Sequence, residues 1–271
     1  MPRFGATPFA FPEFSGATRR LVLLNLFAYF GLLVLQMAFR AEAASLATHL
    51  IFMPGSFLGG QIWQPLTYSL IHPSLIETLL ELLSLWFLGS MLEAEHGSSW
   101  VMGLYGASVL GTPLAAVAIY AVSGPLHFPL SNAPLYGCMG GIFGLLIAIG
   151  VLHGDVQFLM FFVVGIKARY LAAIYALVTI AMLFGEEKMY AFALLGGAAA
   201  GLLYIRLAPR RGFSFMASEG AYGLRNRYYR WKRRRAARKF EVYMRKQGRT
   251  VRFDGNGRLI DEDQDDKKRW N

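Results

Sequence analysis

Long runs of apolar residues constrain this chain more than any other feature of its sequence. Residues 21–39 contain no charge and lie between Arg19-Arg20 and Arg40. A helix needs about 20 predominantly apolar residues to cross a bilayer. Only 16% of all residues are charged, against about 25% in a soluble domain. The sequence therefore predicts an integral membrane protein.

Five further apolar runs complete a pattern of six predicted spans. The runs are 21–39, 73–92, 100–122, 135–152, 170–184 and 190–207. Prolines and paired glycines interrupt residues 40–72, so we expect a structured loop at the membrane surface there. Residues 157–166 are apolar but too short to span, and we expect them to lie at the interface. The predicted fold is an all-α, six-transmembrane-helix bundle.

Charge divides the chain into regions. Residues 209–271 hold 19 of the 27 Lys and Arg but 8 of the 17 acidic residues. We therefore expect an N-terminal arm (1–18), a six-span membrane domain (19–208) and a basic, partly disordered tail (209–271). Basic residues favour the cytoplasmic side. We find no cleavable signal peptide, and expect a bacterial inner-membrane protein with both termini in the cytoplasm.

The tail carries its densest charge between residues 225 and 239, with Tyr228, Tyr229 and Trp231 interleaved. Such juxtamembrane clusters attract anionic lipid headgroups. The predicted headgroup contacts are Arg225, Arg230, Lys232, Arg233, Arg234 and Arg235. A topology anchor without a partner is the alternative, and we expect no nucleic acid partner.

Two apolar runs are rich in glycine. Glycine lowers helix stability, so its repeated use indicates that these helices pack closely against others. We expect a packing role for all of them: Gly137, Gly140, Gly141 and Gly144 in the fourth run, and Gly196, Gly197 and Gly201 in the sixth. The fourth run also contains the only cysteine, Cys138, so no disulfide forms within the chain.

Five segments, in order, resemble the rhomboid family of intramembrane serine proteases. They are 63–72, 85–89 followed by Glu93, 137–144, 158–170 and 194–201. The resemblance covers about residues 20–207. It implies the rhomboid-like six-helix fold of a serine-type endopeptidase, in which a serine on the fourth span and a histidine on the sixth form the catalytic pair.

The residues at the family's catalytic positions differ from that pattern. The serine position holds Met139 and the histidine position holds Leu194, and neither side chain can transfer a proton. The positions that support the oxyanion hold Glu77 and Glu81, whose carboxylates would repel it. The resemblance thus implies an inactive member, a pseudoprotease that binds transmembrane clients without cleaving them.

Two other functions remain open from the sequence. The first is an active intramembrane peptidase with a rearranged site, using Cys138 or Ser131 as nucleophile and His72 or His127 as base. The second is a carboxylate-based carrier, since Glu77 and Glu81 are four residues apart and share a helix face.

The predicted cavity is lined by His72, Glu77, Glu81, Cys138 and Met139. We expect no cofactor there. A metal site formed by His72, Glu77 and Glu81 lacks an identifiable fourth ligand, so we expect no metal either.

Overall fold

The computed structural model describes residues 12–123, 132–160 and 164–207, and residues 228–247 apart from 230, 234, 238, 239 and 242. The chain divides into two units, one up to Phe213 and one from Ser214 onward. His127, Ser131, Arg225, Arg230 and Arg234 lie outside the described residues.

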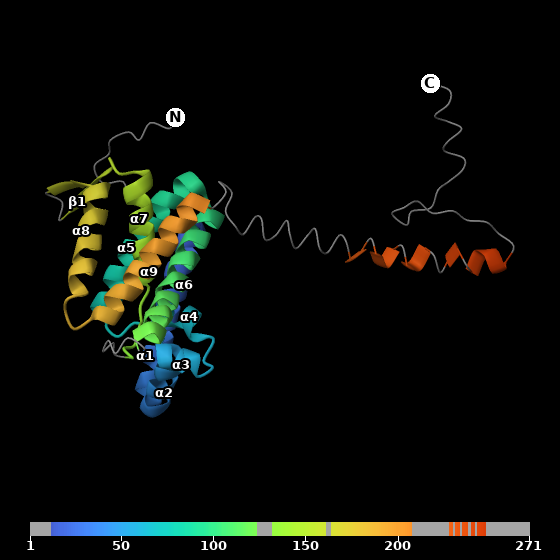
Figure 1. Ribbon diagram of the computed structural model, residues 1–271, viewed down its shortest axis with the longest axis horizontal. Helices are drawn as coiled ribbons and strands as arrows, with labels where there is room; N and C mark the ends of the chain where they lie inside the picture. Colours follow the sequence, from blue (N-terminus) through green and yellow to red (C-terminus); the bar gives the residue numbers. More distant parts are fainter. Residues whose placement is uncertain are drawn as a thin grey trace, which may run out of the picture. The chain divides into compact units, whose positions relative to one another are not determined.

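The described part of the first unit is built from helices and one β-hairpin (Figure 1). Its elements are α1 (Gly16–Ala38), α2 (Arg40–Leu50), α3 (Pro54–Leu58), α4 (Gln64–Thr67), η1 (Tyr68–Leu70), α5 (Leu75–His96), α6 (Ser98–Ser123), α7 (Met139–Leu152), β1 (Gln157–Met160), β2 (Val164–Lys167), α8 (Ala168–Met182) and α9 (Lys188–Leu207).

A helix occupies each of the six predicted apolar runs. Four of these helices, α1, α5, α6 and α9, are long and apolar enough to cross a membrane. The other two, α7 and α8, have 14 and 15 residues, fewer than the roughly 20 that span a bilayer. A helical membrane fold is therefore confirmed, and six spans remain a proposal.

Helix α7 is the centre of the bundle. It packs against α5, α6, α8 and α9, and most of its residues are buried (Figure 1). Glycines on α7 and α9 allow this close approach. A Cβ at Gly197 would lie 3.1 Å from the Ser108 carbonyl oxygen and 3.2 Å from that of Gly140. A Cβ at Gly201 would lie 3.0 Å from Cα of Gly144.

Two segments differ in detail from the sequence prediction. Residues 40–72, expected to form a structured loop, contain the short helices α2 to α4 and η1, and none of these helices is long enough to span. Residues 157–160 and 164–167 pair as antiparallel strands, with Gln157 opposite Lys167. In Figure 1 the hairpin lies at one end of the bundle, and α2 and α3 lie at the other. This apolar run lacks both the alternation of polar and apolar residues and the turn-forming dipeptide that would have predicted a hairpin.

Helix α6 runs without a break through Gly111-Thr112-Pro113, where the sequence predicts an interruption. Proline has no N–H, so the carbonyl four residues earlier, that of Val109, loses its helical partner. The buried Tyr68 hydroxyl donates a hydrogen bond of 2.7 Å to this oxygen. The substitute bond explains how the helix tolerates Pro113.

The described residues of the tail are helical between 228 and 246. Tyr228, Tyr229 and Trp231 are exposed there. The guanidinium of Arg235 lies 5.3 Å from the ring centroid of Trp231. Basic and aromatic side chains therefore occur together on this helical segment.

Candidate functional site

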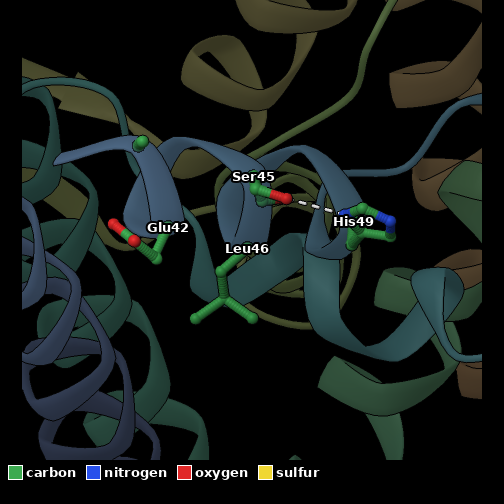
Figure 2. A pocket seen from close by; sticks show the side chains of 5 residues that line it. Glu42, Ser45, Leu46 and His49 are labelled. Carbon is green, nitrogen blue, oxygen red and sulfur yellow. Dashed lines mark hydrogen bonds between the residues drawn. The ribbon is translucent and has the colours of Figure 1, made fainter. Parts of the chain in front are cut away.

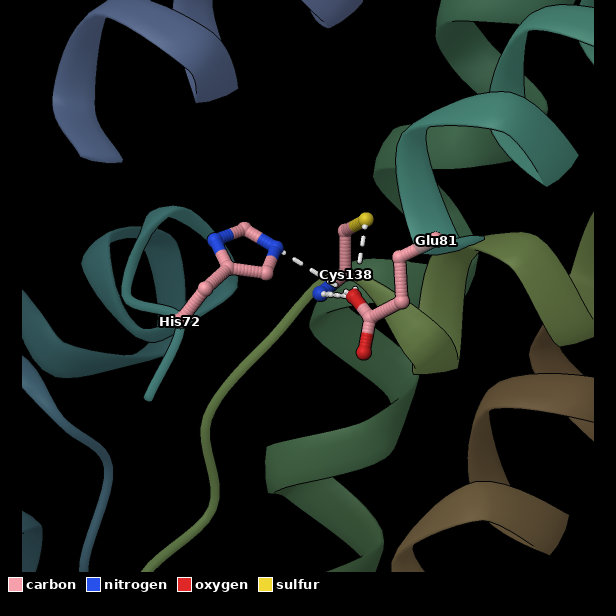
Figure 3. Close-up of side chains that lie close together, drawn as sticks. All are labelled: His72, Glu81 and Cys138. Atoms are coloured by element: carbon pink, nitrogen blue, oxygen red, sulfur yellow. Dashed lines mark hydrogen bonds and ion pairs between the residues drawn. The ribbon is translucent and has the colours of Figure 1, made fainter. Parts of the chain in front are cut away.

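Three buried side chains from separate parts of the sequence meet near the start of α7. His72 follows η1, Glu81 belongs to α5, and Cys138 directly precedes α7. Figure 3 shows the three side chains turned toward one another. One nitrogen, oxygen or sulfur atom from each lies within 4.8 Å of the other two. We call this group the His-Glu-Cys cluster.

The Glu81 carboxylate joins the cluster through a single oxygen. Its Oε2 accepts the Cys138 backbone N–H at 2.7 Å and the Cys138 thiol at 3.1 Å. The same oxygen lies 3.2 Å from Nε2 of His72. A buried carboxylate requires such partners, because removing it from water otherwise costs several kcal/mol.

Backbone contacts bring the three segments together. The Gly137 N–H donates to the carbonyl of Ile71 at 2.8 Å, which ties the His72 loop to the start of α7. Gly137 has a φ of +79°, which favours glycine. A Cβ at this position would lie 2.9 Å from Oε1 of Glu81. Glycine is thus required both by the turn and by the space that Glu81 fills.

The His72 ring is held through its other nitrogen. Nδ1 lies 3.3 Å from the carbonyl oxygen of Leu70, which can only accept a hydrogen bond. The ring therefore donates from Nδ1 and presents Nε2 to Glu81 (Figure 3). Nε2 is buried and has no hydrogen-bond partner of normal geometry among the described residues.

The structure separates the two predicted glutamates. Glu81 is 7% exposed, whereas Glu77 is exposed in the first turn of α5. Its backbone N–H donates to the Ser74 side chain, which caps the helix. Residues four apart differ by about 40° around a helix, enough here to put one carboxylate inside and the other outside. A carrier site using both carboxylates together does not fit this arrangement.

The residues at the two catalytic positions of the rhomboid pattern lie on neighbouring helices. Met139 begins α7 and is half-buried, and Leu194 is buried in α9. Cys138 is 0% exposed, and its thiol donates to Glu81. In this state the thiol is closed to substrate, and its hydrogen-bond acceptor is a carboxylate, whose negative charge disfavours the thiolate.

Sequence reasoning missed the role of Glu93, near the other end of α5. Its carboxylate accepts the backbone N–H groups of Ala17 and Thr18 at 2.6 and 2.9 Å, and the Ser98 hydroxyl also donates to it. Glu93 therefore caps the start of α1. The sequence signal was Glu-x-x-x-Gly-Ser at a helix end, which does not reveal a partner 75 residues away.

A shallow depression on the surface of α2 is lined by Ala41, Glu42, Ser45, Leu46 and His49 (Figure 2). His49 uses its Nδ1 in a 2.8 Å hydrogen bond with the backbone oxygen of Ser45, one turn earlier. That bond holds the ring against its own helix, so the depression gathers no convergent polar groups.

These features define a helical integral membrane protein with a buried polar cluster at the start of α7. The chain belongs to the family described as "Eukaryotic integral membrane protein (DUF1751)", whose model matches residues 21–212. No curated protein matches the chain. Integral membrane localisation is thus confirmed, whereas the family description gives no support to a bacterial inner membrane.

Proposed function

We propose that this protein is a rhomboid-like pseudoprotease that binds transmembrane segments and does not cleave them. The proposal rests on the resemblance of residues 20–207 and on Met139 and Leu194 at the serine and histidine positions. A thioether and an isobutyl group cannot supply the nucleophile and base that amide hydrolysis needs.

One contact in the structure further supports the proposal: the 2.7 Å hydrogen bond from the Cys138 N–H to Glu81. Backbone N–H groups at the start of a helix are natural donors to an oxyanion. Here the protein's own carboxylate occupies that donor. A tetrahedral intermediate forming beside Glu81 would meet a negative charge in place of a hydrogen-bond donor.

Client binding then falls to the outer faces of the long helices. The α7 glycines face α6, α8 and α9 and are not available to a partner. By contrast, α1 and α5 expose large apolar side chains, including Phe27, Met37, Ile76 and Leu80. A second transmembrane helix would pack on these faces by van der Waals contact, in competition with lipid.

The test uses full-length protein in lipid vesicles with a transmembrane substrate that an active rhomboid cleaves. We expect no cleavage, and recovery of the intact substrate with the protein. A photo-crosslinking residue at Leu80 of α5, which is exposed, should capture the substrate. Cleavage by the wild type that is lost in Cys138→Ala would contradict the proposal and support a thiol peptidase.

We also propose that the tail binds anionic lipid headgroups on the cytoplasmic face of the membrane. The observation that favours it is the helical segment on which Trp231, Lys232, Arg233 and Arg235 are all exposed. Each basic residue near an anionic surface contributes about 1 kcal/mol. We expect phosphatidylserine in nanodiscs to protect the tail of the full chain from trypsin, and a Lys232→Glu/Arg233→Glu/Arg235→Glu variant to lose that protection. Equal protection in neutral lipid would contradict it.

A further inference from the structure

We propose that His72, Glu81 and Cys138 bind one divalent metal ion of the zinc type. The proposal does not depend on client binding. The cluster offers one imidazole nitrogen, one carboxylate oxygen and one sulfur, all buried and close together. These are the three donor types that zinc uses in proteins. The sequence led us to expect no metal, because the set His72, Glu77 and Glu81 lacked a fourth ligand, whereas the structure groups Cys138 in place of Glu77 with His72 and Glu81.

The spacing of the ligand atoms suits a tetrahedral ion. Metal–ligand bonds of about 2.0–2.3 Å place tetrahedral ligand atoms roughly 3.3–3.7 Å apart. Oε2 of Glu81 lies 3.2 Å from Nε2 of His72 and 3.1 Å from Sγ of Cys138. All three atoms lie within 4.8 Å of one another, so small side-chain shifts suffice to bind an ion.

The orientation of His72 argues for a cation between it and Glu81. With Nδ1 donating to the Leu70 carbonyl, the neutral ring directs the Nε2 lone pair at the Glu81 carboxylate. Two acceptors at 3.2 Å repel each other unless a proton or a metal ion lies between them. A proton or a metal ion satisfies both acceptors, and a metal ion would in addition take the Cys138 sulfur as a ligand in place of its S–H hydrogen bond to Glu81.

The surroundings resemble the outer shell of a metal site. Metal-binding histidines usually donate their second nitrogen to a backbone carbonyl or carboxylate, as His72 does to Leu70. The Cys138 N–H holds the Glu81 carboxylate in place. Both contacts fix ligand orientation before an ion arrives, and this reduces the entropic cost of binding.

Three protein ligands leave one tetrahedral position for water or another small ligand. In the described part of the chain no fourth His, Cys, Asp or Glu joins the cluster. On binding, the Cys138 S–H bond breaks, a metal–sulfur bond forms and the proton leaves to solvent. No electron transfer is involved.

The first experiment measures metal content in full-length protein that is purified with a histidine-free tag, stripped with chelator, loaded with Zn²⁺ and freed of excess ion. We expect one zinc per chain. Replacing zinc with Co²⁺ should give a thiolate-to-cobalt charge-transfer band in the near ultraviolet. Because Cys138 is the only cysteine, that band in the wild-type protein would identify Cys138 as a ligand of the metal ion.

Variants then assign the other ligands. His72→Gln, Glu81→Gln and Cys138→Ser should each weaken zinc binding by about 10- to 100-fold or more. Glu77→Gln is the matched control, since it removes an exposed carboxylate from the same helix, and it should bind zinc like the wild type. Circular dichroism establishes that each variant is folded.

Two results would overturn the proposal. One is wild-type protein that takes up no stoichiometric zinc. The other is zinc that binds without a sulfur–cobalt band, which would place it elsewhere. Both are read from the wild type, so misfolding of a variant cannot hide them. Neither result depends on substrate cleavage or client capture.

Discussion

The hydroxyl of Tyr68 donates a 2.7 Å hydrogen bond to the backbone carbonyl of Val109, the oxygen that Pro113 leaves without a helical partner. Tyr68→Phe should therefore destabilise the protein by about 1–3 kcal/mol, because it leaves a buried acceptor unsatisfied. Pro113→Ala restores the missing N–H, so Tyr68→Phe should cost less in that background. Detergent unfolding followed by circular dichroism measures the double-mutant cycle. If Tyr68→Phe lowered the unfolding free energy equally in both backgrounds, the Tyr68 hydroxyl would not be compensating for Pro113.

The same tyrosine predicts a dependence on pH. Burial raises the pKa of Tyr68 above its usual value near 10. Above about pH 10 the unfolded chain releases the phenol proton while the folded protein retains it, so the stabilisation falls as pH rises. The difference in unfolding free energy between wild type and Tyr68→Phe should be constant below about pH 9 and shrink above about pH 10. A difference that grows with pH would contradict this.

Helix packing predicts the cost of added methyl groups. In Gly197→Ala the new Cβ would lie 3.1 and 3.2 Å from two backbone oxygens, which cannot move aside easily. We expect a loss of about 1–3 kcal/mol in unfolding free energy. Gly106→Ala in α6 is the control, because nothing lies within 4 Å of its Cβ, and it should be neutral or slightly stabilising.

The turn at Gly137 predicts a local effect on the His-Glu-Cys cluster. Gly137→Ala combines a strained positive φ with a contact of 2.9 Å to Glu81. Gly60→Ala has a positive φ as well, of +106°, but its Cβ meets open space. Both should lose stability through strain, by about 1–2 kcal/mol, and only Gly137→Ala should also alter zinc uptake. Equal zinc uptake in the two would show that Glu81 tolerates the contact.

The cap on α1 predicts the effect of neutralising Glu93. Glu93→Gln retains one acceptor oxygen for the N–H groups of Ala17 and Thr18, but loses the second oxygen and the charge. We expect the unfolding free energy to fall by about 1–3 kcal/mol. Glu95→Gln, which alters an exposed contact with His153, should cost at most about 1 kcal/mol. Similar losses would argue against a cap.

The positions of the helices could be predicted from the sequence, because each apolar run carries the signal within itself. The ends were less predictable. Helix α8 begins at Ala168 rather than at Tyr170, since the preceding hairpin pairs residues up to Lys167. The continuity of α6 through Pro113 was unpredictable, because its compensation comes from a tyrosine 45 positions earlier in the chain.

The sequence by itself determined a helical membrane protein with a basic tail, since apolar length and charge distribution are local properties. Only the tertiary structure decided which polar groups meet. It buried Glu81 and exposed Glu77, although both belong to one helix. It also brought His72 and Cys138, 66 positions apart, to the same carboxylate oxygen. Such contacts depend on how the His72 loop packs against α7, which no local pattern encodes.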